Sequence, residues 1–481
     1  MSNMEMMMRR VMSDLLPLRA AIKASVVNRL ALYLVIAVPV FVLVFLATLD
    51  PPRASAVPSY ARQTGLACSG CHYTPPELNP AGRRFKLLGY TDKGDETKVV
   101  KADSGKMRAA LDLLGTLPLS AMLEASFTAT QSPVPGTQNG SFELPQDVSL
   151  FLAGAWTSHV GSFLQITYDT QDDHFTSDNT DIRYANKTKL FGKEMVYGAD
   201  LNNNPTVEDL WNSTPAWGYP WIAADGQSLP VPNAGPIING SLAQDVAGLG
   251  GYGMWNEHLY LDVTIYRTEH VGSPQPNAGV GYSYNIRGVA PYWRAAWQQS
   301  TATTQYEFGT YGMHMDSTPN SITGLKDHYT DVAVDTQIDR TMFRKDILSV
   351  RGTYIHENSG LDATYAALGA QSISHHLDTF MANAEYHFGN RISSTFGWFE
   401  TFGTADPLLY PQAPVYGNSA NGDPRSAGYI ANVSYWPWQN LQLAAQYTGY
   451  TRFNGAGTDY DGAGRNASAN NTTYLDVKFI F

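Results

Sequence analysis

One short motif in the sequence has residue types and spacing that could do chemistry: Cys68-Ser69-Gly70-Cys71-His72. Two thiols at this spacing can add to the two vinyl groups of one haem, and the adjacent imidazole can then bind the iron as its proximal ligand. The motif therefore predicts one covalent haem c, attached at Cys68 and Cys71 and ligated by His72. No acid–base or nucleophilic catalytic residue is predicted.

Three other interpretations explain the motif less well. A structural zinc site needs four ligands, and the chain has only two cysteines, so no second pair exists. A thioredoxin-type pair belongs in a βαβ setting, which the sequence does not provide. A plain disulfide would leave His72 without a role.

The residues that follow the motif predict a small helical segment. Asn79 before Pro80 is typical of a helix start, with Asn as the cap and Pro in the first position. The cations of this segment, Arg83, Arg84 and Lys86, could pair with haem propionates or lie in solvent.

A protein-derived sixth iron ligand is expected from outside this segment, because residues 73–106 contain neither His nor Met. A thioether ligand raises the potential of a haem. Met381 is the first choice and Met122 the second, with Lys86 or water as the remaining options. The competing candidates are three histidines near strand ends: His159, His258 and His387.

The N-terminus reads as a targeting segment. Residues 1–29 are basic, residues 30–49 form an uncharged apolar run, and Ala54-Ser55-Ala56 is a small-x-small cleavage site. The alternative is a retained membrane anchor, since twenty apolar residues can span a bilayer. Cleavage after Ala56 is preferred. It leaves 26 Lys and Arg and 40 Asp and Glu in the mature chain, a balance that excludes a nucleic-acid partner.

In the rest of the chain, apolar and polar residues alternate with a period of two. Leu259, Leu261, Val263 and Ile265 alternate with polar or amphipathic neighbours, as do Leu475, Val477 and Phe479 near the C-terminal Phe481. Segments about ten residues long with one apolar face are the pattern of a membrane β-barrel. A soluble β-sandwich would not explain why short and long connections alternate along the chain.

Sixteen strands are predicted, an even number that suits an antiparallel barrel. They span residues 117–130, 147–157, 160–171, 179–187, 190–201, 242–252, 257–268, 286–297, 301–315, 327–340, 343–356, 373–388, 391–402, 427–435, 440–452 and 472–481. The fold class is thus all-β: a 16-stranded antiparallel outer-membrane barrel with a small N-terminal α-helical cytochrome c segment. Parity places ten charged residues in the lumen: Glu124, Asp169, Arg183, Asp262, Arg294, Glu307, Asp331, Asp335, Arg351 and Glu385. The loop 202–241, poor in charge, is expected on the exterior.

Three parts follow from this pattern: a signal peptide (1–56), a monohaem cytochrome c domain (57–106) and a porin-like barrel (107–481). A domain as small as the second buries too little surface to fold well alone. We therefore expect it in or under the barrel lumen, facing the periplasm or the lumen, with the barrel in outer-membrane lipid.

Residues 58–91 resemble the fused monohaem cytochrome c–porins of the bacterial outer membrane, which oxidise extracellular Fe(II). The resemblance is carried by the Tyr-Ala-Arg-Gln-Thr-Gly run at 60–65, the Cys-x-x-Cys-His motif and the Arg-Arg-Phe-Lys-Leu-x-Gly-Tyr run at 83–90. It implies an oxidoreductase of the iron:cytochrome c type. Electrons would pass from extracellular Fe(II) through the haem to a periplasmic acceptor such as a cytochrome c or a copper protein. The alternatives are a passive porin with a structural haem and a haem peroxidase.

The cleavage site gives the first testable prediction. N-terminal sequencing of the protein purified from outer membranes should begin at Val57, because the small residues before it suit a signal peptidase. A purified chain that still contains residues 30–49 would show that the segment is a retained anchor.

Overall fold

The computed structural model describes residues 58–91, 99–100, 113–114, 118–134, 136–170, 173–217, 230–268, 285–319, 324–343, 346–411 and 418–481. The predicted signal peptide lies outside these ranges. No helix within them is long and apolar enough to cross a membrane.

In the described ranges, sixteen long strands form a closed antiparallel barrel in which the first strand, β3, pairs with the last, β19. They are β3 (Leu119–Thr130), β5 (Asp147–Ala155), β6 (Val160–Asp169), β7 (His174–Leu190), β8 (Lys193–Asn202), β9 (Val246–Trp255), β10 (Leu259–Thr268), β11 (Ala290–Ser300), β12 (Thr304–Ser317), β13 (Asp327–Thr341), β14 (Ile347–Gly360), β15 (Ser374–Phe388), β16 (Ile392–Gly403), β17 (Ser426–Trp438), β18 (Leu441–Arg452) and β19 (Thr472–Ile480). The sixteen predicted strands are confirmed. The largest shift is at β7, which starts five residues earlier than predicted because His174 pairs with Asp169 across the hairpin.

Shorter strands complete the described part. A three-residue strand, β4 (Ser141–Glu143), pairs with the C-terminal half of β3, whereas β5 pairs with the N-terminal half of β3. Two further dipeptides, β1 (Val99–Val100) and β2 (Leu113–Leu114), pair with each other. The remaining short helices are α4 (Asp362–Ala366), η3 (Pro215–Trp217), η4 (Ile237–Ser241) and η5 (Ala467–Asn470).

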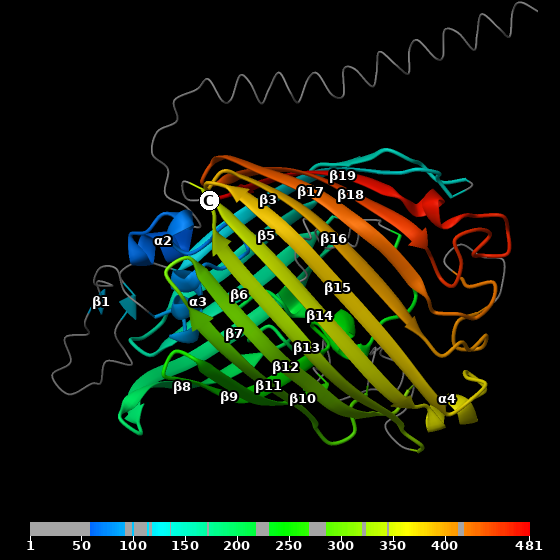
Figure 1. The fold of residues 1–481 in the computed structure, drawn as a ribbon, viewed down its shortest axis with the longest axis horizontal. Coiled ribbons are helices and arrows are strands. Elements are labelled where there is room, and N and C mark those ends of the chain that lie inside the picture. The colour runs from blue at the N-terminus through cyan, green and yellow to red at the C-terminus, as the bar shows by residue number, and fades with distance from the viewer. Residues whose placement is uncertain are drawn as a thin grey trace, which may run out of the picture. The chain divides into compact units, whose positions relative to one another are not determined.

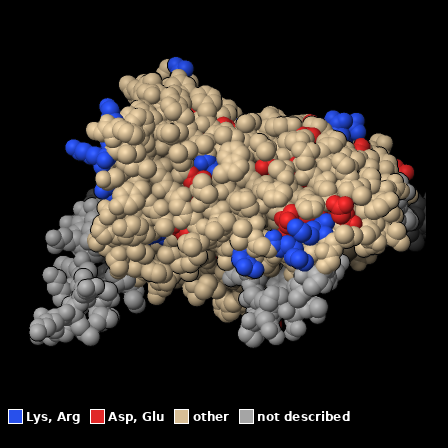
Figure 2. Space-filling view, turned by 90° about the horizontal axis from the view of Figure 1, so that it is seen from below, with Lys and Arg blue, Asp and Glu red and all other residues tan. Residues whose placement is uncertain are grey.

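The predicted alternation separates an apolar outside from a polar inside. On β10, Leu261, Val263 and Ile265 are 48–63% exposed, whereas the residues between them, Asp262 and Thr264, are buried. Charged side chains are sparse over most of the face in Figure 2. A closed barrel leaves no unpaired strand edge, and with an apolar outer surface it can cross lipid.

The two ends of the barrel differ. At one end of the barrel the seven connections, such as residues 191–192 and 439–440, have two to five residues. At the other end all connections have nine residues or more, except the four-residue connection 170–173. Figure 1 shows α2 (Pro58–Thr64), α3 (Pro80–Leu87) and the C-terminus at one end of the strands and α4 at the other. In outer-membrane barrels the short turns face the periplasm.

The N-terminal segment, residues 58–91, contacts strands on opposite sides of the short-turn mouth. The Tyr60 hydroxyl donates to the Ser162 carbonyl on β6 (2.8 Å), and the Tyr90 hydroxyl donates to Asp181 on β7 (2.6 Å). Across the mouth, Thr74 bonds to His387 on β15 (2.8 Å). The segment is therefore bound to the barrel wall on both sides.

Two described parts of the long connection between β8 and β9, residues 203–214 and 236–238, fold inward rather than out. Residues 206–211 are buried, and Asp209 pairs with Arg294 of β11 at 2.9 Å. Further along, the Ile237 and Ile238 N–H groups donate to Glu357 and Asp331 (2.7 and 2.9 Å). For these residues the expectation of an exterior loop was wrong, because charges of the wall satisfy their polar groups; residues 218–229 lie outside the described part of the chain.

The charged residues that strand alternation predicts to face the lumen are buried inside the barrel wherever their side chains are described. Arg294 is fully buried and bonds to Glu307 on β12, Asp335 on β13 and Asp209 in the loop. Nine of the ten are buried; the side chain of Asp169 is outside the described part. The nine come from eight strands, and several of them form buried ion pairs in the lumen, such as Arg294 with Asp335 and Arg351 with Glu385.

Breaking this network should destabilise the barrel. Arg294→Met leaves three buried carboxylates without their cation, which costs about 3–5 kcal/mol. We expect the variant to unfold at a lower denaturant concentration than the parent in detergent. Unfolding is measured by tryptophan fluorescence. Arg425→Met is the matched control: its pair with Glu400 is partly exposed, so its loss should cost less than about 1 kcal/mol. Equal effects of the two variants would contradict the prediction.

Candidate functional site

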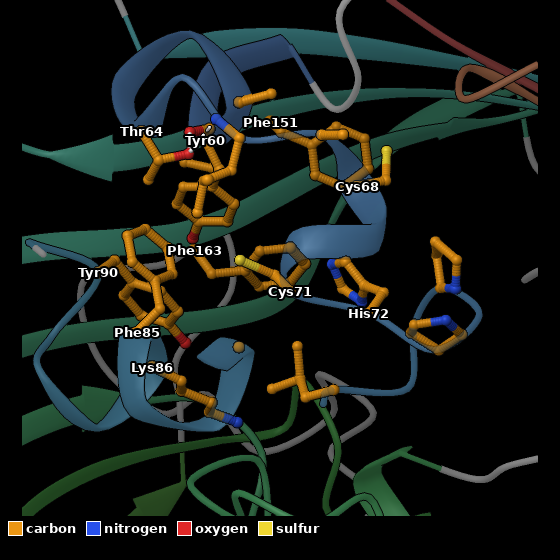
Figure 3. A pocket seen from close by; sticks show the side chains of 18 of the residues that line it. Tyr60, Thr64, Cys68, Cys71, His72, Phe85, Lys86, Tyr90, Phe151 and Phe163 are labelled. Carbon is orange, nitrogen blue, oxygen red and sulfur yellow. Dashed lines mark hydrogen bonds between the residues drawn. The ribbon is translucent and has the colours of Figure 1, made fainter. Parts of the chain in front are cut away.

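A pocket of about 200 Å³ lies where the N-terminal segment meets the barrel wall. The segment contributes α2, the cysteine motif and α3, and the wall contributes inward residues near the short-turn ends of β5, β6 and β19. Its lining is mostly apolar, with six aromatic side chains: Tyr60, Phe85, Tyr90, Phe151, Phe163 and Trp217. Figure 3 shows Cys68, Cys71 and His72 on one side and the rings of Phe85 and Tyr90 opposite.

A tight turn brings the three motif side chains to the same pocket. In η1 (Cys68–Gly70) the Cys71 and His72 N–H groups both donate to the Cys68 carbonyl, at 3.0 and 2.9 Å. The two thiols are not joined in a disulfide, and burial raises the pKa of the Cys71 thiol. Cys68 lies beside the β17–β18 turn, where its backbone N–H and thiol donate to Gln439.

The orientation of His72 suits a metal ligand. Its Nδ1 donates to the Glu77 carbonyl oxygen at 3.2 Å, which leaves the Nε2 lone pair free for a metal. Burial lowers the pKa of His72, so the ring stays neutral near pH 7. A neutral imidazole oriented by a backbone carbonyl is the common arrangement of a histidine ligand.

The loop after the motif is anchored through Glu77. Its carboxylate contacts Arg351 and lies 3.0 Å from His387 Nε2. Burial alone would raise the pKa of Glu77, but these two partners lower it to about 2. Glu77, Glu385 and His387 are also close enough to hold a metal ion. Because Arg351 already bonds to both glutamates, the group acts as an ion-pair network that fixes the carbonyl behind His72.

The helix α3 begins as predicted, with the Asn79 side chain accepting from the Ala81 and Gly82 N–H groups. Gly82 is needed for its close packing on the motif. A Cβ at this position would stand 2.2 Å from the Cys71 carbonyl oxygen. Helix and motif therefore touch backbone to backbone.

The three cations of α3 bond to protein groups rather than lying free. Arg83 is buried and pairs with Asp339, and the partly exposed Arg84 pairs with Glu257 at 2.9 Å. Lys86 lines the pocket and donates to the Val207 and Asp209 carbonyls at 2.5 and 2.7 Å. Its ammonium also lies 4.1 Å from the centre of the Trp217 ring. Burial lowers the pKa of Lys86 to about 7.

Neither predicted distal methionine borders the pocket. Met122 on β3 and Met381 on β15 are on the inward-facing side of their strands, but neither lines the pocket, and nor do His159, His258 or His387. Apart from His72, the side chains with nitrogen that line it are Lys86 and Trp217. The identity of a sixth iron ligand stays a prediction.

Sequence reasoning missed the wall of the pocket. Phe151 and Ala153 on β5, Phe163 on β6 and Ile480 on β19 complete it, together with Trp217 of the inward loop. Their alternation marks Phe151 and Ala153 as inward-facing, but nothing local indicates that they face a segment about 85 residues earlier in the chain.

The fold defines the chain as a porin-type β-barrel of the bacterial outer membrane. No family model and no curated protein matches the chain. Solved structures similar to it include the outer membrane channel DcaP of Acinetobacter baumannii, at 12% identity, TM-score 0.44, and coverage of 76% of this chain and 96% of that one. Another is an anion-selective porin from Comamonas acidovorans, at 11% identity, TM-score 0.44, and coverage of 76% and 98%.

Two neighbouring arginines test how the segment is attached. Arg83→Met leaves Asp339 buried without its cation, so the segment should detach more easily and be cleaved faster by chymotrypsin in detergent. Arg84→Met, which loses only partly exposed pairs with Glu257 and Glu194, should leave the cleavage rate nearly unchanged. If Arg83→Met is cleaved no faster than the parent, the buried pair does not hold the segment.

Proposed function

We propose that the chain is an outer-membrane electron-transfer protein that passes electrons from extracellular Fe(II) to a periplasmic carrier through one haem c. The observation that carries this proposal is the pocket at the short-turn end. Two thiols that are not joined in a disulfide and the neutral ring of His72 border the same apolar space there. The Fe(II) donor follows from the family resemblance of residues 58–91.

The residues of the pocket fit a covalent haem. Cys68 and Cys71 would hold the vinyl groups, and the Nε2 of His72 is free for the iron. Bound there, the haem would supply a one-electron carrier. The aromatic side chains make the lining largely apolar, and Glu77 fixes the ring of His72 through its backbone carbonyl.

The position of the pocket suits exchange with a periplasmic partner. Leu66, at its rim, is 48% exposed, so a small carrier protein can approach the short-turn mouth. One Fe²⁺ becomes Fe³⁺ for each electron that the periplasmic acceptor gains. No bond is made or broken in this exchange, and no proton is transferred.

A passive channel is the second candidate, favoured by the barrel itself. Sixteen strands around a polar lumen are the architecture of diffusion porins. The N-terminal segment is bound across one mouth of this barrel, which favours a restricted pore.

The haem assignment is tested by removing the thiols. Cys68→Ala combined with Cys71→Ala should abolish haem staining of the denatured band, because no covalent link remains. His72→Ala should shift the spectrum of whatever haem stays attached. Haem staining that persists in the double variant would overturn the assignment.

The donor is tested by stopped-flow mixing of the oxidised protein with Fe(II), with ascorbate and dithionite as comparison donors. We expect Fe(II) to reduce the haem and planar-bilayer conductance to stay well below that of an open porin. Reduction by dithionite but not by Fe(II), together with porin-like conductance, would instead support the passive channel.

A further inference from the structure

The hairpin of β7 and β8 extends past its neighbours at the short-turn end of the barrel. The two strands pair with each other up to Leu190 and Lys193. In contrast, β6 pairs with β7 only as far as Tyr184, and β9 pairs with β8 only from Met195 onward. Residues 186–190 therefore pair with β8 alone, and at ~3.3 Å per residue they carry the hairpin roughly 16 Å past the end of β6. Figure 1 shows the hairpin at the same end of the barrel as α3.

A tight turn closes the hairpin and places an aromatic ring at its tip. Phe191 and Gly192 both have positive φ, at 53° and 78°, as in the two-residue turns that fit the twist of antiparallel strands. The Leu190 carbonyl accepts a hydrogen bond from the Trp255 ring at 3.1 Å, which fixes the tip to β9. Phe191 itself is 88% exposed. The hairpin thus presents a large apolar side chain to solvent on a fixed support.

Two lysines continue the inward face of β7 beyond the rim of the barrel. Arg183 and Ala185 are buried on that face, and Lys187 and Lys189 follow at the same spacing of two but are exposed. Neither ammonium group forms an ion pair with another described residue. The hairpin therefore carries two unneutralised cations on the side that faces the mouth.

The same face of the hairpin adjoins the segment that lines the pocket. The chain just after α3 packs on β7, since a Cβ on Gly89 would stand 3.1 Å from the Arg183 carbonyl oxygen. On β8, Glu194 lies 3.6 Å from Arg84 of α3. Other residues of α3 line the pocket itself. A molecule bound to the two lysines would therefore lie next to α3 and the pocket.

The exposed charge around this mouth is positive, although the whole chain has 43 Asp and Glu against 32 Lys and Arg. Described residues of the N-terminal segment and of the strand ends and turns at this mouth include six exposed cations but two exposed anions. The cations are Arg62, Lys187, Lys189, Lys193, Arg340 and Arg391, and the anions are Glu194 and Glu257. A surface with this excess attracts and orients a negatively charged partner.

We propose that the mouth-facing side of the β7–β8 hairpin is the docking site of an acidic periplasmic protein. Lys187 and Lys189 pair with carboxylates of that protein, and Phe191 adds the aromatic contact that is common in protein interfaces. The two lysines lie on the inward face of their strand rather than on the face that continues toward lipid, which favours a protein over a phospholipid as the occupant. That this protein is the electron carrier rests on the proposed function; the binding of an acidic protein does not.

The test compares two forms of one probe protein: mitochondrial cytochrome c, which is basic, and the same protein after succinylation, which replaces lysine ammonium groups by carboxylates. Binding to the purified full-length chain in neutral detergent is measured by surface plasmon resonance. We expect the succinylated form to bind about tenfold more tightly or better, and this preference to shrink as salt rises from about 20 mM to about 300 mM. Equal affinity for the two forms would overturn the docking site.

Variants of the hairpin locate the binding. Lys187→Gln combined with Lys189→Gln should weaken binding of the succinylated probe about fivefold or more, because two charge pairs are lost. Phe191→Ser should weaken it without changing its salt dependence. Native mass spectrometry of the same detergent samples tests the lipid alternative. If the lysine variant loses bound phosphatidylglycerol while its affinity for the probe is unchanged, the hairpin contacts lipid and the proposal fails.

A matched control changes the net charge equally at the opposite end. Arg267 and Arg452 are exposed where β10 and β18 reach the long loops. Arg267→Gln combined with Arg452→Gln should therefore bind the succinylated probe like the parent. Weakening as large as that of the lysine variant would show that only the total charge matters and would contradict the proposal.

A haem-free arm separates this inference from the proposed function. The Cys68→Ala and Cys71→Ala double variant should keep the parent's preference for the succinylated probe, because the hairpin does not depend on the thiols. If Fe(II) fails to reduce the haem while the lysine-dependent binding persists, the proposed function fails and the docking site stands. If Fe(II) reduces the haem but the two probe forms bind equally, the docking site fails alone.

Discussion

Residues 58–91 are too few to enclose a pocket by themselves, and this constraint governs how the molecule is organised. The barrel wall supplies the missing half: Phe151 and Phe163 face Phe85 and Tyr90 across the same space. Buried pairs such as Arg83–Asp339 fix the segment in register with the wall. The pocket is therefore formed by the N-terminal segment and the barrel wall together, and neither of them encloses it alone.

The inward loop is the second element that connects these parts. Its Asp209 bonds to Arg294 of the wall, while the Asp209 carbonyl accepts from Lys86 of the segment. One residue thus connects strand, loop and segment. Its neighbour Glu208 is so deeply buried that burial raises the pKa of its carboxyl to about 7, although the Tyr292 hydroxyl opposes this. The loop holds the charges of the lumen in place as well as narrowing it.

Local sequence patterns predicted the features that depend on neighbouring residues, such as strand faces and helix starts. Alternation in β10 fixes which residues face lipid, and the Asn79-Pro80 pair marks the start of α3. What local patterns could not show are contacts between distant residues. The hydrogen bond from Lys86 to the Val207 carbonyl joins positions 121 residues apart. The residues around Lys86 in the sequence do not indicate this partner. The inward fold of this loop was missed for the same reason, since its partners are charges on four separate strands, β7, β11, β13 and β14.

The seam of the barrel has a consequence for biogenesis. The first and last strands, β3 and β19, meet beside α2, where Ser59 lies 3.2 Å from Ser120, and Ile480 of β19 completes the pocket. Synthesis makes the N-terminal segment before the barrel and this wall residue after the other fifteen long strands. The pocket therefore exists only once the final hairpin has joined the first strand. Any group to be attached to the two thiols by an enzyme is best attached earlier, while the segment is still accessible, so maturation of the segment would precede closure of the barrel.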